Sequence, residues 1–101
     1  MPRVLLVGSG ARESALALRL AESSDVCAFT GHANPSLVER SVDHAVGDVC
    51  DPAAAAAYAR TVNPDLAVVS SDGPLEAGVV DALREAGVPT MGADRLGAQI
   101  E

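Results

Sequence analysis

Three short, uninterrupted apolar runs constrain the fold of this chain more than any other feature of its sequence. They span residues 4–7, 26–29 and 66–69. A run of this length without polar alternation is typical of a strand that is buried on both faces, as in a parallel sheet. Segments with helical spacing separate the runs, so strands and helices alternate. We therefore predict an α/β fold: an open parallel sheet of about five strands, Rossmann-like, with helices on both faces.

Helix signals support this order of elements. Asp51 followed by Pro at the next position is typical of a helix start, and that helix is predicted over 52–62. A second helix is predicted to open at Pro74 and to stop at Gly87, where glycine suits a helix C-terminus. Two weaker strands and a last helix are predicted over 44–46, 88–91 and 94–101. The last helix lacks a stop signal, so we expect a single N-terminal domain, 1–101, of a longer protein.

Charge and composition exclude several classes of protein. The 101 residues include 14 acids and 7 bases, giving a net charge of −7, and only 2% are aromatic. Neither nucleic acid nor an anionic membrane is therefore an expected partner. No apolar run approaches the ~18 residues that span a bilayer, and no signal peptide precedes the first strand, so we expect a cytoplasmic protein. Cys27 and Cys50 lack metal-type spacing and are expected to be small buried hydrophobes.

Ligands of open parallel sheets bind beyond the carboxyl ends of the strands, where we expect three loops: 8–13, 30–35 and 70–74. In the first loop, Gly8 and Gly10 permit a tight turn, and the next helix N-terminus offers free N–H groups to an anion. A dinucleotide fingerprint would require Gly at the position of Glu13, so a single phosphate assisted by Arg12 fits better than NAD. A tight turn with no ligand remains the alternative.

The other two loops contain polar residues with two possible roles each. Asn34 favours a turn and is also a candidate ligand contact. Asp72 is a candidate for binding an amine or a sugar hydroxyl, or for capping the helix that Pro74 opens. The chain offers no assignable catalytic triad and no metal site.

These loops together resemble the N-terminal domain of phosphoribosylamine–glycine ligase, also called glycinamide ribonucleotide synthetase, of the ATP-grasp superfamily. The resemblance covers the whole chain and is most specific over 4–13, 31–35 and 66–78. It implies a pre-ATP-grasp domain that faces the phosphoribosyl substrate, and an enzyme of purine biosynthesis that joins glycine to 5-phosphoribosylamine. The substrate-binding residues that it implies are Gly8, Gly10, Arg12, Glu13, Asn34, Asp72 and Pro74.

The same resemblance implies that ATP and Mg²⁺ are bound by later ATP-grasp domains, which are absent here, so no cofactor is expected in this chain. Its expected partners are phosphoribosylamine, glycine and those remaining domains. The sequence departs from the family at Ala11 and Ser14, which replace Gly and His, and at 70–72, where Ser-Ser-Asp replaces Gly-Pro-Glu. A non-catalytic nucleotide-binding module of Rossmann-like fold is the alternative function.

Overall fold

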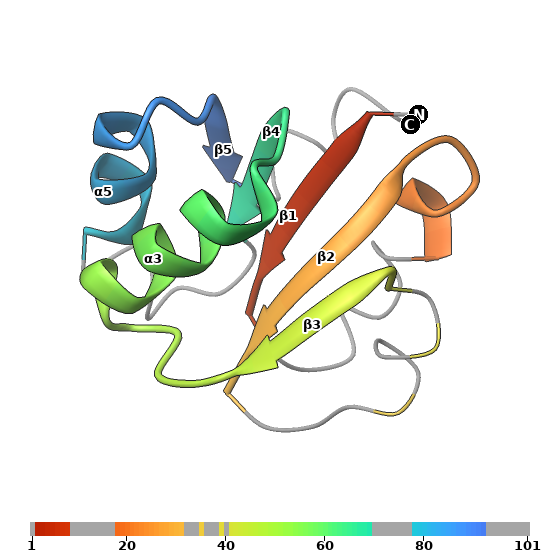
Figure 1. The fold of residues 1–101 in the computed structure, drawn as a ribbon, viewed down its shortest axis with the longest axis horizontal. Helices are drawn as coiled ribbons and strands as arrows, with labels where there is room; N and C mark the ends of the chain where they lie inside the picture. The colour runs from red at the N-terminus through yellow and green to blue at the C-terminus, as the bar shows by residue number, and fades with distance from the viewer. Residues whose placement is uncertain are drawn as a thin grey trace.

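The structure is a computed structural model. It describes residues 2–8, 18–31, 35, 39, 41–69 and 78–92, and of these it describes residues 91 and 92 by their backbone alone. Its centre is a five-stranded sheet in the order β3-β2-β1-β4-β5 (Figure 1). All four pairings between neighbouring strands are parallel. The predicted α/β class and the number of strands are confirmed. The strands are β1 (Arg3–Val7), β2 (Asp25–Thr30), β3 (Asp43–Val46), β4 (Leu66–Val69) and β5 (Thr90–Gly92).

The core has two layers because alternate side chains of the strands project to opposite faces. On one face Leu5, Val7, Phe29 and Val69 pack against α3 (Pro52–Val62) and α5 (Val79–Glu85). Figure 1 shows both helices on this side of the sheet. On the other face Val4, Leu6, Val26, Ala28 and Val68 form a second cluster, against which Leu20 and Ala21 pack. The apolar runs 4–7 and 26–29 are therefore buried on both faces of the sheet, as their pattern predicted.

Helix α3 begins and ends where its sequence signals predicted. The Asp51 carboxylate accepts hydrogen bonds from the N–H groups of Ala53 (3.0 Å) and Ala54 (3.4 Å), and Pro52 occupies the first turn. These bonds satisfy two of the N–H groups that a helix start leaves unpaired. At the other end Asn63 adopts a left-handed conformation (φ 52°) and donates to the carbonyl of Ala59 at 2.8 Å. The alanine-rich sequence between these ends lets the helix lie close to the sheet.

Helix α5 corrects the prediction of one continuous helix from Pro74. The described helix begins only at Val79, after Gly78 in a left-handed conformation (φ 85°) that an α-helix cannot continue through. Its end is as predicted, because Gly87 has φ 87° and donates to the carbonyl of Arg84 at 3.0 Å. Pro74 itself lies outside the described residues.

Strand β5 begins two residues later than predicted because Val88 still belongs to the end of α5. Its N–H donates to the carbonyl of Leu83 at 3.0 Å, which completes a Schellman motif. Pro89 has no N–H to donate, although its carbonyl accepts from Ala67 on β4 at 2.8 Å. Pairing with β4 therefore starts at Thr90, and Gly92 is a strand residue rather than the predicted turn.

The amino edge of the sheet is closed by Arg3 and Asp65. The Arg3 guanidinium donates from Nη1 to the carbonyl of Val62, the last residue of α3, at 2.8 Å. The backbone N–H of Arg3 donates to the Asp65 carboxylate at 2.9 Å, and the Asp65 N–H donates to the Arg3 carbonyl at 2.7 Å. These bonds fix the position of the first residue of β1 relative to α3 and β4. Because the strand is extended, they thereby also fix the position at which its last residue lies.

Candidate functional site

Three strands end at the same level on the carboxyl edge of the sheet. Val7 is in register with Phe29 on one side and with Val69 on the other. The segments that follow β1, β2 and β4 therefore start beside one another. In the order of the strands, β1 is the strand between β2 and β4.

Gly8 is the one predicted site residue within the described part of the chain. It is buried and has φ 144°, a conformation that favours glycine. Its N–H donates to the carbonyl of Phe29 at 3.1 Å, which extends the β1–β2 ladder by one bond. The chain thus leaves the sheet at Gly8 with its first amide already paired, so that amide is not available to an anion.

The other predicted site residues lie outside the described residues. They are Gly10, Arg12, Glu13, Asn34, Asp72 and Pro74. The structure places the strand ends from which their loops begin, and the positions of these six residues stay predictions.

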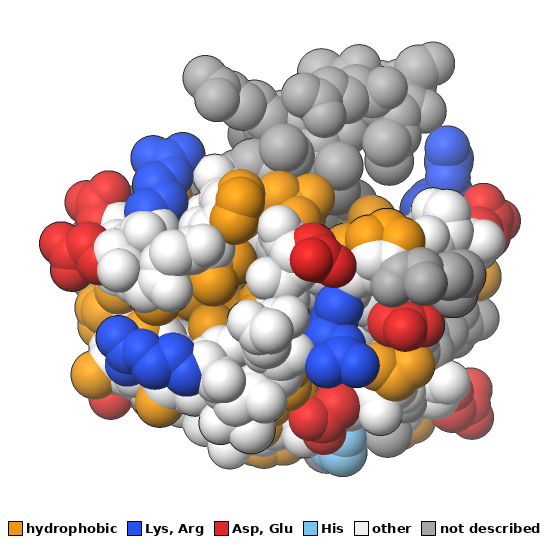
Figure 2. Space-filling model, turned by 45° about the horizontal axis from the view of Figure 1, so that its top comes forward, with side chains coloured by type: hydrophobic (Ala, Val, Ile, Leu, Met, Phe, Trp, Pro, Cys, Tyr) orange, Lys and Arg blue, Asp and Glu red, His pale blue; other side chains and the backbone are white. Residues whose placement is uncertain are grey.

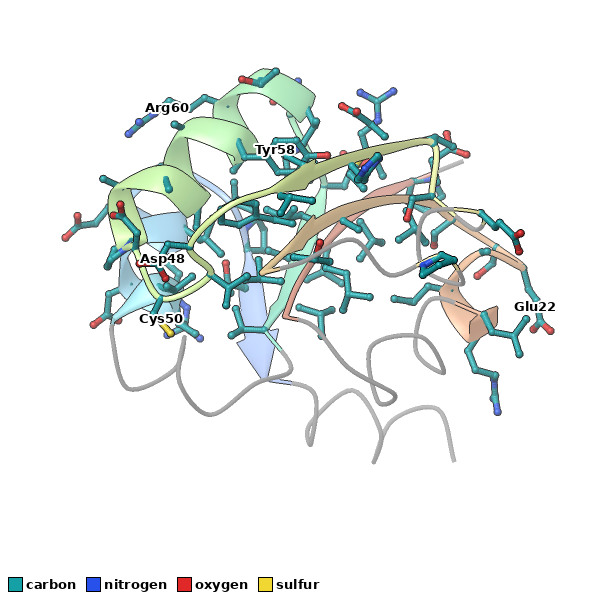
Figure 3. All side chains as sticks on the ribbon, turned by 90° about the horizontal axis from the view of Figure 1, so that it is seen from below. Glu22, Asp48, Cys50, Tyr58 and Arg60 are labelled. Atoms are coloured by element: carbon teal, nitrogen blue, oxygen red, sulfur yellow. The ribbon has the colours of Figure 1, made fainter. Side chains whose placement is uncertain are left out.

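The loop between β3 and α3 lies at the same edge, and its acidic side chains are used within the loop. Asp48 accepts a hydrogen bond from the N–H of Cys50 at 2.9 Å, and Asp51 caps α3. Figure 3 shows Asp48 and Cys50 together in this loop. Because a carboxylate already occupies the N-terminus of α3, that helix end does not attract a phosphate. The expected anion site therefore stays with the loop after β1.

Thr30, the last residue of β2, is a polar residue of this edge that sequence reasoning passed over. The sequence shows it only as the place where a dinucleotide fold would carry an acid. In the structure Thr30 is 2% exposed, and its hydroxyl oxygen is buried without a hydrogen-bond partner among the described residues. The available signal was a hydroxyl residue that ends an otherwise apolar strand.

Phe29 lies near the carboxyl edge of the sheet, and its side chain packs into the core. Its ring stacks on that of Tyr58 from α3, with centroids 5.7 Å apart. Gly47 lies against the other part of the ring, because a Cβ atom added to Gly47 would meet Phe29 Cε1 at 2.9 Å. Tyr58 reaches from α3 toward the sheet, whereas Arg60 on the same helix points away (Figure 3). The Phe29 ring, near the end of β2, is therefore packed against both Tyr58 and Gly47.

The two cysteines differ in their environments. Cys27 is buried as predicted, but Cys50 is exposed, because it lies in the loop before α3 rather than in a strand. Burial raises the pKa of the Cys27 thiol, an effect that the charge of Arg3 partly offsets. Burial, and after it the charge of Asp43, raise the pKa of the Tyr58 hydroxyl. Over the described residues, no group of His, Cys, Asp and Glu side chains is arranged to hold a metal ion.

Comparison with known proteins identifies the family. The family model described as phosphoribosylglycinamide synthetase, N domain, matches residues 2–101. The chain belongs to this family. The resemblance predicted from the sequence motifs is thereby confirmed.

Proteins named phosphoribosylamine–glycine ligase are among the relatives of this chain. The Methanopyrus kandleri protein is 46% identical over all of this chain, and the Thermococcus kodakarensis protein is 38% identical over 98% of it. In both cases the chain spans 23% of the relative's length. A solved Mycobacterium tuberculosis structure, described as glycinamide-RNase-transformylase T, is similar in fold. It has a TM-score of 0.66 and 26% identity, and the match covers 87% of this chain and 28% of that one.

Two further properties of the chain are visible in its described residues. On the face drawn in Figure 2, arginine side chains are interspersed with acidic ones rather than gathered into a basic patch. Among the described helices, none has the length and hydropathy that crossing a membrane requires.

Proposed function

We propose that this chain is the substrate-side domain of an ATP-dependent ligase that joins glycine to 5-phosphoribosylamine in purine biosynthesis. The observation that carries the proposal is the family match over 2–101, supported by relatives named phosphoribosylamine–glycine ligase at up to 46% identity among those compared. ATP would supply the phosphoryl group that activates the glycine carboxylate, leaving ADP, and the amine of phosphoribosylamine would then displace phosphate from the acyl phosphate. The protein that carries this domain works in the cytoplasm.

The phosphoribosyl end of the substrate binds beyond the carboxyl ends of β1, β2 and β4. Gly8 and Gly10 shape the first turn, and Arg12 meets the phosphate while Glu13 lies beside it. Asn34 and Asp72 take the uncharged or cationic parts of the substrate, and Pro74 fixes the loop after Asp72. The common register of the three strand ends supports this arrangement, because it starts all three loops at one place.

We propose that this chain itself holds neither ATP nor Mg²⁺. The chain contains no lysine, its only bases being seven arginines, and Asp51 fills the N-terminus of α3. The described residues also lack a cluster of metal-ligating side chains. We propose that ATP and Mg²⁺ are bound by the ATP-grasp domains of the same protein. No step of the reaction is assigned to this chain through either group.

The test is a ligase assay on the complete product of the gene that encodes this chain. We expect ADP to form only when both glycine and phosphoribosylamine are present. Arg12→Ala should lower kcat/KM for phosphoribosylamine at least about tenfold, as expected for loss of one charge-assisted hydrogen bond. Arg60→Ala, which removes an exposed arginine of α3, should leave the kinetics unchanged. A folded protein that binds a nucleotide but ligates nothing would instead support the non-catalytic module.

A further inference from the structure

The end of β2 carries a buried hydroxyl that pairs with no described residue. Thr30 is buried at 2% exposure, and its side-chain oxygen has no hydrogen-bond partner among the described residues. A buried hydroxyl without a partner destabilises a folded protein, and such groups in native structures call for a specific reason. Val26 and Ala28, which share its face of β2, are apolar, so an apolar residue at position 30 would suit the packing.

The backbone of Thr30 holds this hydroxyl in a defined place. Its carbonyl accepts the N–H of Gly47 at 2.9 Å on the β3 side. On the β1 side, the bond from Gly8 to the carbonyl of the preceding residue, Phe29, places Gly8 beside Thr30. The side-chain hydroxyl pairs with no described residue. It therefore lies next to the first glycine of the proposed phosphoribosyl site, on the opposite face of the sheet from α3.

We infer that Thr30 is a further substrate-binding residue, whose hydroxyl gains its hydrogen bond from the sugar phosphate that binds at this edge. The inference rests on the proposed function for the class of ligand. A threonine hydroxyl both donates, as to a phosphate oxygen, and accepts, as from a ribose hydroxyl. The bound state thus satisfies a group that the free state leaves unsatisfied. The difference adds to affinity without adding to the stability of the free protein.

Thr90 provides a matched control within the same sheet. It is also buried, at 7% exposure, but its hydroxyl donates to the carbonyl of Val88 at 2.9 Å. Replacing Thr90 with Val therefore removes a bond that the free protein makes. Replacing Thr30 with Val removes a hydroxyl that pairs with no described residue.

The experiment measures binding and stability for the 101-residue chain and its Thr30→Val, Thr30→Ser and Thr90→Val variants. Isothermal titration with ribose 5-phosphate and with inorganic phosphate gives the affinities, and urea denaturation gives the midpoints. We expect Thr30→Val to bind ribose 5-phosphate about tenfold more weakly with an unchanged or higher urea midpoint. Thr30→Ser keeps the hydroxyl and should bind within about threefold of the wild type, although losing the methyl group lowers the midpoint. Thr90→Val should lower the midpoint and leave both affinities unchanged.

The two probes distinguish which part of the ligand Thr30 meets. Weaker binding of both probes by Thr30→Val assigns the hydroxyl to the phosphate, and weaker binding of ribose 5-phosphate alone assigns it to the ribose. Equal binding by the wild type and Thr30→Val overturns the inference and leaves the proposed function standing. A wild-type chain that binds neither probe also overturns it, and the separate ligase assay then decides the proposed function.

Discussion

At the scale of single residues, the two cysteine thiols differ in burial, although the sequence gives no sign of this difference. Cys27 and Cys50 look equivalent in the sequence, yet only Cys27 is buried, within β2, and Cys50 lies in an exposed loop. Cys50 should therefore react with a thiol reagent in the folded protein. Cys27 should react only after denaturation. The number of thiols modified per chain before and after unfolding measures the difference.

The buried thiol also makes the protein sensitive to alkaline pH. The folded-state pKa of Cys27 is raised above its usual value of 9.0, so the unfolded chain releases this proton first as pH rises. The contribution of the Cys27 thiol to the free energy of unfolding is fully present below about pH 9. It is lost as the pH rises from there through the folded-state pKa of Cys27. The free energy of unfolding, measured by urea denaturation from about pH 8 to pH 11, should fall less steeply for Cys27→Ala.

A matched variant separates this titration from the loss of packing. Val26→Ala removes buried volume from the neighbouring position of β2 without removing a titratable group. It should lower stability at every pH while keeping the alkaline slope of the wild type. A slope for Cys27→Ala equal to that of Val26→Ala would contradict the role of the thiol.

At the scale of elements, helix α3 depends on its cap more than on its composition. Asp51 accepts two N–H groups of the first turn, and no other acidic residue lies in that turn. Asp51→Ala should therefore cost about 1 kcal/mol of stability. Asp81→Ala, which removes the same charge from an exposed position of α5, should cost clearly less. Equal losses in urea denaturation would show that charge, rather than capping, is what Asp51 supplies.

Local signals explain which elements the sequence predicts well. Asp51 and Asn63 act within their own helix, so the bounds of α3 are predictable from neighbouring residues. The start of β5 is not predictable from neighbouring residues. It depends on the hydrogen bond from the Val88 N–H to the Leu83 carbonyl, which decides in the folded chain that Val88 belongs to the end of the helix and not to the strand. Gly78 was equally ambiguous, since glycine is tolerated within a helix and also breaks one.

The residues of the candidate site differ in the same way: some are predictable from local sequence signals, and others are not. Gly8 was predictable because a glycine that ends a buried strand signals a turn, and its φ of 144° agrees. Thr30 was not, because the state of its hydroxyl depends on what surrounds it from β1 and β3. Asp72 and Arg12 remain predictions, since their positions depend on loops outside the described residues.

At the scale of the whole molecule, the sheet is most stable at its centre. β1 is paired on both sides, and residues 4–7 are at most 3% exposed. β3 is an edge strand whose last residue, Val46, is 52% exposed. Native-state hydrogen exchange should therefore be slowest for the amides of Leu5 and Leu6 and clearly faster for those of β3. Equal protection of the two strands would show that the sheet opens only as a unit.

The place of β1 in the sheet has a consequence for the order in which the protein folds during synthesis. Of the five strands, the central one is made first, and Leu66, which pairs with its residue Val4, is made 62 residues after Val4. Until then β1 has β2 alone, and its other edge stays open to the strands of any neighbouring nascent chain. Slow translation over 30–65 would prolong that exposure. Aggregation on the ribosome should respond to codon usage in this interval more than to codon usage after β4.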